Sequence, residues 1–140
     1  MSLPLRHAEI ELTVPFHDLD PLDIVWHGNH VRYFEQARSA LLQSFDYDYP
    51  QMRASGYAWP VVDLQVRYAR PLTYQQRIRV RAELMEWEHR LRIRYQVADA
   101  ASGERLCRGQ TIQVAVRIAD RETCFASPPI LAERLGFALP

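Results

Sequence analysis

"NHVRYFEQARSALLQSFDY", residues 29–47, has the periodicity of a helix with an unusually wide apolar surface. When the residues are placed at 100° intervals, polar side chains occupy only about a third of the circumference. The apolar arc contains Val31, Phe34, Ala37, Leu41, Leu42 and Phe45. A helix this apolar is not stable when it contacts the protein along one narrow edge. We therefore predict a central helix over about residues 29–46 that the rest of the chain surrounds.

The segments on either side of this helix alternate between apolar and polar residues, as β-strands do when one face is buried. The alternation predicts strands over residues 8–16, 57–72, 76–87, 90–99 and 105–120, and a short helix over 128–137. In the last strand we expect Ile112, Val114, Val116 and Ile118 to be the buried positions. This order of elements predicts the α+β class: a curled antiparallel sheet of about five strands wrapped around one long central helix.

Length and charge set limits on the class of protein. At 140 residues, 48% of them hydrophobic, the chain fits a single domain spanning residues 1–140 with a substantial core. It has 17 basic and 17 acidic side chains and no formal net charge. This balance argues against a nucleic-acid-binding protein that depends on bulk attraction to phosphate.

The only two cysteines, Cys107 and Cys124, form no CxxC pair. This argues against a disulfide framework or a structural zinc site, and it favours a reducing compartment. The first residues contain no apolar run typical of a signal peptide, and no window approaches the length of a membrane span. We therefore expect a cytoplasmic protein with no membrane span.

The loop "DPLDIVWHGNH", residues 20–30, gathers polar and titratable residues immediately before the helix. Hydrolysis at a carbonyl carbon needs a base or nucleophile and hydrogen-bond donors for the developing oxyanion. Asp20 offers the carboxylate, and His27 is able to orient water or protonate a leaving group. The helix start offers backbone N–H groups at His27, Gly28 and Asn29. The loop therefore makes Asp20 and His27 candidates for catalysis.

Two other interpretations of the loop are open. It is also what an ordinary helix start looks like, with Asn29 as the N-cap. His30, one residue into the helix, is more typical of a structural histidine than of a catalyst. The residue types that bind zinc or iron are present as His17, Asp18, Asp20, His27 and His30. We expect no metal site, because there is no HExxH motif and no pair of ligands at i,i+4.

The segment "FHDLDPLDIVWHGNHVRYFEQAR", residues 16–38, resembles the hot-dog fold thioesterases, in the branch of 4-hydroxybenzoyl-CoA thioesterase and bacterial acyl-CoA thioesterases. The matching positions are Phe16, Asp18, Asp20, Ile24, Val25, His27, Asn29, Tyr33, Glu35, Ala37 and Arg38. The resemblance implies a hot-dog domain that hydrolyses an acyl-CoA or aryl-CoA thioester to the free acid and CoA. It further implies no cofactor, and a dimer or tetramer with active sites between subunits.

The resemblance also implies roles for single residues. Asp20, the second aspartate of the Asp-x-Asp pair, either attacks the thioester carbonyl or activates a water. The family places basic residues that contact the CoA phosphates in a segment that is "EWEHRLR" here, which makes His89, Arg90 and Arg92 the candidates. Tyr57, Trp59 and Tyr68 are aromatic candidates for lining the acyl or aryl slot. Asp23 is a departure, because family members usually have glycine at this position.

Other functions on the same scaffold are an acyl-carrier-protein thioesterase, a hydratase or dehydratase acting on acyl carriers, and a non-catalytic module that binds acyl thioesters. The tight spacing of Asp20 and His27 before the helix favours hydrolysis over dehydration.

Overall fold

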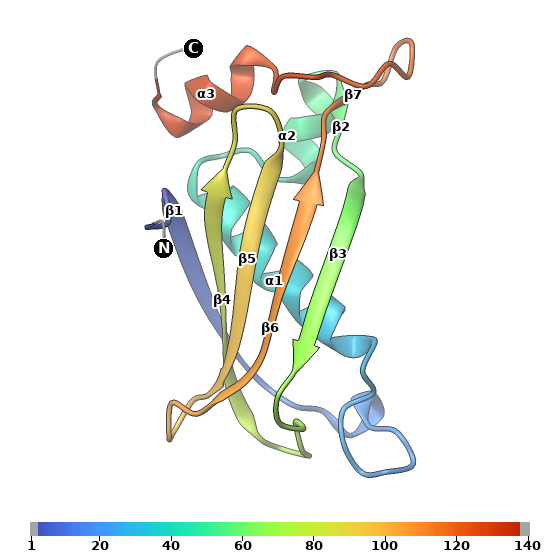
Figure 1. Cartoon of the computed structure of the whole chain (residues 1–140), viewed down its shortest axis with the longest axis vertical. Helices are drawn as coiled ribbons and strands as arrows, with labels where there is room; N and C mark the ends of the chain where they lie inside the picture. Colours follow the sequence, from blue (N-terminus) through green and yellow to red (C-terminus); the bar gives the residue numbers. More distant parts are fainter. Residues whose placement is uncertain (1–2, 138–140) are drawn as a thin grey trace.

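The computed structural model describes residues 3–137, in which a five-stranded antiparallel sheet curves around one long helix (Figure 1). The strands are β1 (Arg6–Thr13), β3 (Val61–Tyr68), β4 (Arg77–Glu86), β5 (Leu91–Asp99) and β6 (Arg105–Gln113), in the order β1-β4-β5-β6-β3. The short strands β2 (Tyr57–Ala58) and β7 (Val116–Arg117) pair with each other. The helices are α1 (Asn29–Ser44), α2 (Tyr49–Ala54) and α3 (Pro129–Leu135), and η1 (Phe16–Asp18) is a single 3-10 turn. The predicted α+β hot-dog architecture is confirmed.

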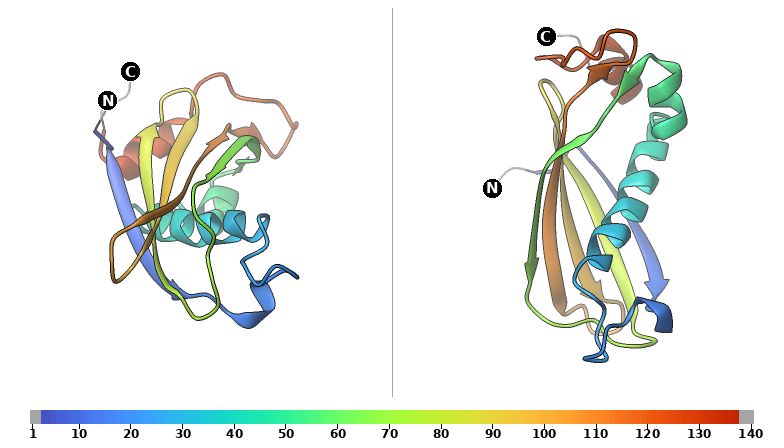
Figure 2. Two further views of the ribbon diagram at one scale, coloured as in Figure 1. Left: turned by 60° about the horizontal axis from the view of Figure 1, so that its bottom comes forward. Right: turned by 90° about the vertical axis from the view of Figure 1, so that its right-hand side faces the viewer.

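Helix α1 lies against one face of the sheet, as the side view in Figure 2 shows. Its buried side chains are His30, Tyr33, Phe34, Ala37, Leu41 and Leu42. Phe34 stacks on Tyr95 of β5 with ring centroids 4.6 Å apart. On β6, a Cβ atom at Gly109 would lie 2.4 Å from the Phe34 ring, so the close approach of helix and strand requires glycine here. This packing fixes where the first turn of α1 lies relative to the sheet.

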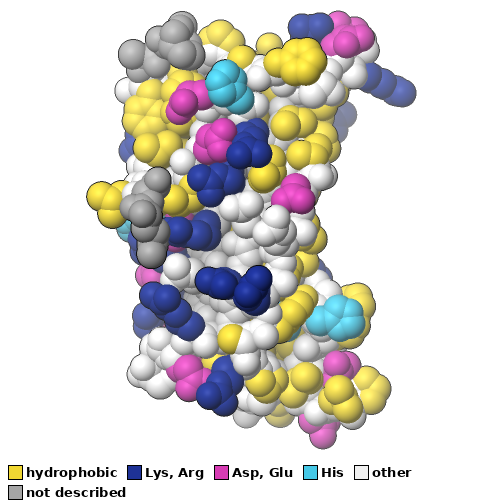
Figure 3. Space-filling view, in the orientation of Figure 1, with side chains coloured by type: hydrophobic (Ala, Val, Ile, Leu, Met, Phe, Trp, Pro, Cys, Tyr) yellow, Lys and Arg dark blue, Asp and Glu magenta, His cyan; other side chains and the backbone are white. Residues whose placement is uncertain are grey.

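The opposite face of the sheet carries charged side chains, and arginines are spread across it in Figure 3. Glu83 of β4 receives hydrogen bonds from Arg81 and Arg94, each over 3.0 Å. Desolvation by burial would raise the pKa of Glu83, but the hydrogen bonds and charges of Arg81 and Arg94 outweigh it and lower that pKa. The sheet therefore has one apolar face, covered by α1, and one polar face.

The predicted phase of the last long strand is wrong. The structure buries Thr111, Gln113 and Ala115, whereas Ile112 and Val114 are only half-buried and Ile118 is exposed. Gly109 lies against Phe34 of α1, so the odd-numbered residues from Gly109 onward face the helix. The strand also ends at Gln113, and β7 follows as a separate element.

Several boundaries differ by a few residues. The first strand ends at Thr13, before Pro15, which precedes the 3-10 turn. The segment 57–72 divides at Pro60 into β2 and β3, in line with the missing N–H of proline. Helix α2 was not predicted, although Asp48 and Gln51 form a capping box at its start. Within residues 3–137, no helix is both long enough and apolar enough to cross a membrane.

Candidate active site

The loop that joins β1 to α1 lies at one end of the sheet, at the bottom of Figure 1. Backbone hydrogen bonds hold it in place: Val25 N–H donates to Leu72 O over 2.9 Å, and Trp26 N–H donates to Asp18 O over 3.0 Å. Ile24 forms an isolated bridge with Thr73. The loop is therefore a fixed part of the fold, tied to the segment that follows β3.

Asp18, the first aspartate of the pair, is buried and anchors the loop to α1. Its carboxylate accepts a 2.6 Å hydrogen bond from the Tyr33 hydroxyl, and Arg32 lies 3.4 Å away. Burial and the hydrogen bond to Asp18 raise the pKa of Tyr33. Asn29 also donates from its side chain to the Asp18 carbonyl oxygen over 3.0 Å. With its oxygens occupied in this way, Asp18 has a structural role.

Asp20, the second aspartate, is half-buried, and its carboxylate accepts fewer hydrogen bonds than that of Asp18. Its Oδ1 accepts the Leu22 N–H over 2.8 Å, which closes the turn of residues 20–23. Its Oδ2 has no hydrogen-bond partner among the residues that the structure describes. Asp20 lines a cavity of about 380 Å³ together with His27, His30, Tyr68 and Arg70. The structure thus brings the two predicted catalytic side chains, Asp20 and His27, to one cavity.

Asp23 is exposed and has a φ of 61°, in the left-handed region. Its N–H donates to Asp20 O over 3.0 Å, as part of the same turn. Glycine adopts this conformation without steric cost, and aspartate tolerates it better than most residues. The backbone therefore gives a physical reason why glycine suits this position.

At the start of α1, Gly28 and not Asn29 is the N-cap. The Asn29 N–H donates to Trp26 O over 2.9 Å, so it is already used by the turn. The N–H groups of His27 and Gly28 donate to no acceptor within residues 3–137. A Cβ atom at Gly28 would lie 2.2 Å from the Trp26 ring, which packs over this backbone. Two unused backbone donors therefore remain at the positive end of the helix dipole.

His30 is only 2% exposed, and it lines the same cavity as Asp20. Its Nδ1 lies 3.1 Å from His27 O, which also accepts the Tyr68 hydroxyl over 2.7 Å. Its Nε2 has no hydrogen-bond partner among the described residues. Sequence analysis missed this residue as part of the site. A signal was available, because His30, Phe34 and Ala37 follow the i, i+4, i+7 spacing of the buried face.

The predicted CoA-binding residues lie at the other end of the sheet, near the β4–β5 hairpin (Figure 1). Arg90 and Arg92 both donate to Glu86, over 3.0 and 3.4 Å. His89 lines a separate cavity beside the loop of residues 122–129. Within one protomer, the structure does not bring these residues to Asp20.

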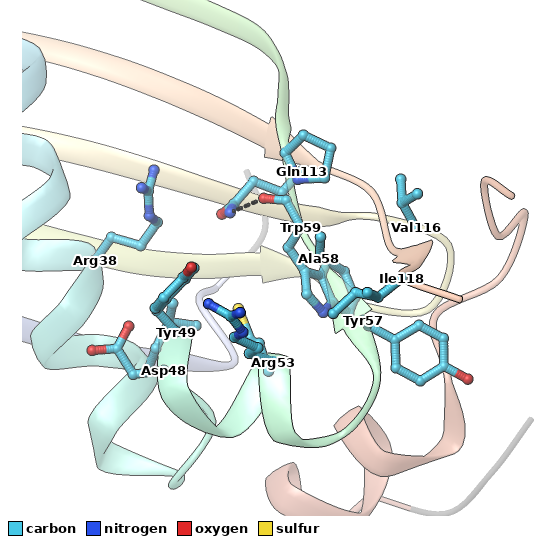
Figure 4. Close-up of a pocket in the computed structure, with 13 residues that line it drawn as sticks. Arg38, Asp48, Tyr49, Arg53, Tyr57, Ala58, Trp59, Gln113, Val116 and Ile118 are labelled. Carbon is cyan, nitrogen blue, oxygen red and sulfur yellow. Dashed lines mark hydrogen bonds between the residues drawn. The ribbon is translucent and has the colours of Figure 1, made fainter. Parts of the chain in front are cut away.

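Trp59 lines a further cavity, of about 530 Å³, at this same end (Figure 4). Its walls come from α2, from the end of α1 and from the segment of β2, and they include Leu42, Met52 and Tyr57. At the sheet side, Gln113 donates to Trp59 O over 2.7 Å, and Arg38 faces the same space (Figure 4). This cavity has apolar walls with a polar floor, as a site for an acyl or aryl group requires.

The structure gives less support to a metal site or to a cysteine nucleophile. Within residues 3–137, no three His, Cys, Asp or Glu side chains are grouped so that they could hold a metal ion. Both cysteines are free, and burial raises the pKa of the Cys107 thiol to about 12. This thiol is therefore protonated at neutral pH and a poor nucleophile.

A family model described as the thioesterase-like superfamily matches residues 14–135. The chain is 30% identical over 128 residues to a protein of Synechocystis sp. that is named as an esterase, covering 91% of this chain and 77% of that protein.

Solved structures share the fold. A 1,4-dihydroxy-2-naphthoyl-CoA thioesterase from Synechocystis superposes with a TM-score of 0.82 at 20% identity, covering 93% of this chain and 96% of that one. A mutant 4-hydroxybenzoyl-CoA thioesterase in complex with 4-hydroxybenzoyl-CoA gives a TM-score of 0.80 at 17% identity, covering 93% and 99%.

Proposed function

Because the chain belongs to the thioesterase-like superfamily, we propose that it hydrolyses acyl-CoA or aryl-CoA thioesters at the cavity that contains Asp20. One observation carries this proposal. Asp20 has a carboxylate oxygen without a partner, and it shares a cavity with His27 next to two unused backbone N–H groups. A base beside oxyanion donors is the arrangement that acyl transfer to water requires.

In the proposed reaction, Asp20 acts as a general base toward water. The water oxygen bonds to the thioester carbon while one water proton moves to Asp20. The N–H groups of His27 and Gly28 donate to the oxyanion that forms, supported by the dipole of α1. When the oxyanion collapses, the C–S bond breaks, and the CoA thiolate takes the proton back from Asp20. The exposed His27 ring is suited to orient the water or the leaving sulfur.

We further propose that a second copy of the chain completes the site, by pairing along β3. This strand is at the edge of the sheet, so its outer N–H and C=O groups are unpaired within the protomer. Its exposed apolar side chains are Val61, Val62, Leu64 and Tyr68. An unprotected apolar edge of this kind favours pairing with another strand.

Antiparallel pairing of two β3 strands would bring opposite ends of the two protomers together. The strand has eight residues and is about 26 Å long. Tyr68 at its end lines the Asp20 cavity, and Pro60, just before its start, lines the Trp59 cavity. A two-fold axis through the middle of β3 would therefore set the Asp20 cavity of one protomer beside the Trp59 cavity of the other.

This assembly gives each predicted binding residue a role. The acyl or aryl group enters the Trp59 cavity of the partner, and the CoA nucleotide reaches the partner's β4–β5 hairpin with His89, Arg90 and Arg92. Both arginines keep free N–H donors for phosphate, because each uses only part of its guanidinium on Glu86 and its neighbours.

The test is thiol release from a panel of acyl-CoA and aryl-CoA thioesters, with the same acyl groups on acyl-carrier protein as a second arm. We expect hydrolysis of at least one CoA thioester by the wild-type protein. Faster release from the carrier protein would change the substrate class, and no release from either arm would refute thioester hydrolysis.

A further inference from the structure

We infer that His30 holds the hydrolytic water, together with Asp20, by accepting one of its hydrogens at Nε2. This inference rests on the proposed function and assigns a catalytic residue to it. Three features of the structure lead to it: the tautomer of the buried imidazole, the free nitrogen that remains, and the cavity shared with Asp20.

The hydrogen bond to His27 fixes the tautomer. Nδ1 of His30 lies 3.1 Å from the His27 carbonyl oxygen, which is able only to accept a hydrogen bond. Nδ1 therefore carries the ring proton, and in the neutral imidazole Nε2 has a lone pair. A buried acceptor that stays unsatisfied is unfavourable, because it has lost its hydrogen bonds to water. A donor from outside the described protein groups is the partner that Nε2 lacks.

The neighbours of His30 do not supply that donor. The Tyr68 ring packs edge-on against the imidazole with centroids 4.8 Å apart, but its hydroxyl donates to His27 O. The Tyr33 hydroxyl donates to Asp18. His30 and Asp20 line the same cavity of about 380 Å³, which has room for several waters at roughly 30 Å³ each. We therefore assign the missing donor to a water that enters from this cavity and reaches the buried Nε2.

A water held between these two groups would be oriented for attack. One hydrogen would point to Asp20 Oδ2, which has no partner among the described residues, and the second would point to His30 Nε2. With both hydrogens held, the oxygen lone pairs are directed at the thioester carbon. The proton on the Asp20 side is transferred, and the other hydrogen remains on oxygen and becomes part of the product acid. Burial lowers the pKa of His30, which keeps the imidazole neutral and Nε2 able to accept.

Two substitutions test the contributions of the two ring nitrogens separately. In His30→Asn, the amide N–H takes the place of Nδ1–H and keeps the bond to His27 O, but nothing occupies the Nε2 position. In His30→Gln, the longer side chain brings an acceptor oxygen to the Nε2 position and loses the Nδ1 bond. We expect kcat of His30→Asn to fall by about 10- to 100-fold, with KM and melting temperature near those of the wild type. His30→Gln should keep most of kcat while its melting temperature falls.

The opposite order, with His30→Asn active and His30→Gln impaired, would mean that His30 has only a structural role. A higher KM with unchanged kcat in His30→Asn would mean that Nε2 binds the substrate and not the water. Either result overturns the inference while leaving thioester hydrolysis intact.

A crystal structure of the resting protein gives a readout that does not depend on turnover. We expect an ordered water within hydrogen-bonding distance of Asp20 Oδ2 and His30 Nε2, and its loss in His30→Asn. An Nε2 bonded directly to a protein group would overturn the inference even if no substrate had been found.

Discussion

The Tyr33 hydroxyl donates a 2.6 Å hydrogen bond to the buried carboxylate of Asp18, two residues before Asp20. The two aspartates of the pair thus have different surroundings: Asp18 is held by α1, and Asp20 faces a cavity. The anchoring of Asp18 fixes the path of the loop, so that Asp20 and His27 line one cavity. A rigid scaffold of this kind is what a positioned base requires.

Tyr33→Phe should therefore destabilise the fold more than it impairs the chemistry. The substitution leaves a buried carboxylate without its shortest hydrogen bond, and we expect the free energy of unfolding to fall by about 1–3 kcal/mol. Urea denaturation measures this loss. If stability is unchanged, Asp18 is not the anchor of the loop.

Gly109→Ala tests the close contact between β6 and α1. The added Cβ would lie 2.4 Å from the Phe34 ring and 2.8 Å from the Gln65 carbonyl oxygen, a backbone atom that moves little. We expect a loss of about 1–3 kcal/mol in thermal or urea unfolding, the usual cost of overpacking. Gly28→Ala is the matched control, since its Cβ meets only the exposed Trp26 ring, which is free to rotate away. Equal losses in the two variants would contradict this account.

Stability should also depend on pH through His30. Burial lowers its pKa below the ordinary value of 6.5. In the window between the two values, the unfolded chain binds a proton and the folded protein does not, so stability falls as the pH falls. Between about pH 7.5 and pH 5.5, the wild type should lose more free energy of unfolding than His30→Asn, which lacks the titrating ring. Parallel losses in both proteins would mean that His30 does not titrate abnormally.

Pairing through β3 predicts that a charge on this strand abolishes assembly and activity together. Leu64 is 44% exposed within the protomer, and in the proposed dimer it lies at the interface. We expect Leu64→Glu to be a folded monomer by light scattering and to lose most thiol release, because the site is then incomplete. Leu5→Glu is the control, because it makes the same change at a leucine that is 42% exposed just before β1, at the opposite edge of the sheet, and it should change neither property. A monomeric but fully active Leu64→Glu would exclude the shared site.

Periodicity predicted most of the fold because burial in α1, β4 and β5 follows the apolar positions of the sequence. It failed in β6, where the inward residues are Gly109, Thr111 and Gln113, and where Gly109 lies against Phe34 of α1. That contact joins β6 to α1, so the sequence of β6 alone does not predict it. Helix α2 was missed for a different reason, because it is too short for periodicity and is marked only by its capping box.

The candidate site, like the fold, could be predicted from the sequence only in part. Asp20 and His27 were predicted together because they belong to one loop, whose geometry is local. His30 was judged structural because neither the hydrogen bond at its Nδ1 nor the cavity that it lines follows from the local sequence. Trp59, Arg90 and Arg92 lie at the far end of the protomer, and only a second copy would connect them with Asp20. Sequence periodicity does not encode that relationship.

The most direct test of the central claim is kcat of Asp20→Asn on the best CoA thioester. The substitution keeps the shape and the bond to the Leu22 N–H but removes the base. We expect kcat to fall by about 100- to 10,000-fold while CoA binding and the melting temperature are retained. Asp23→Asn, the same change at an exposed aspartate in the same turn, should leave kcat unchanged. If Asp20→Asn folds normally and hydrolyses the thioester as fast as the wild type, Asp20 is not the catalytic base.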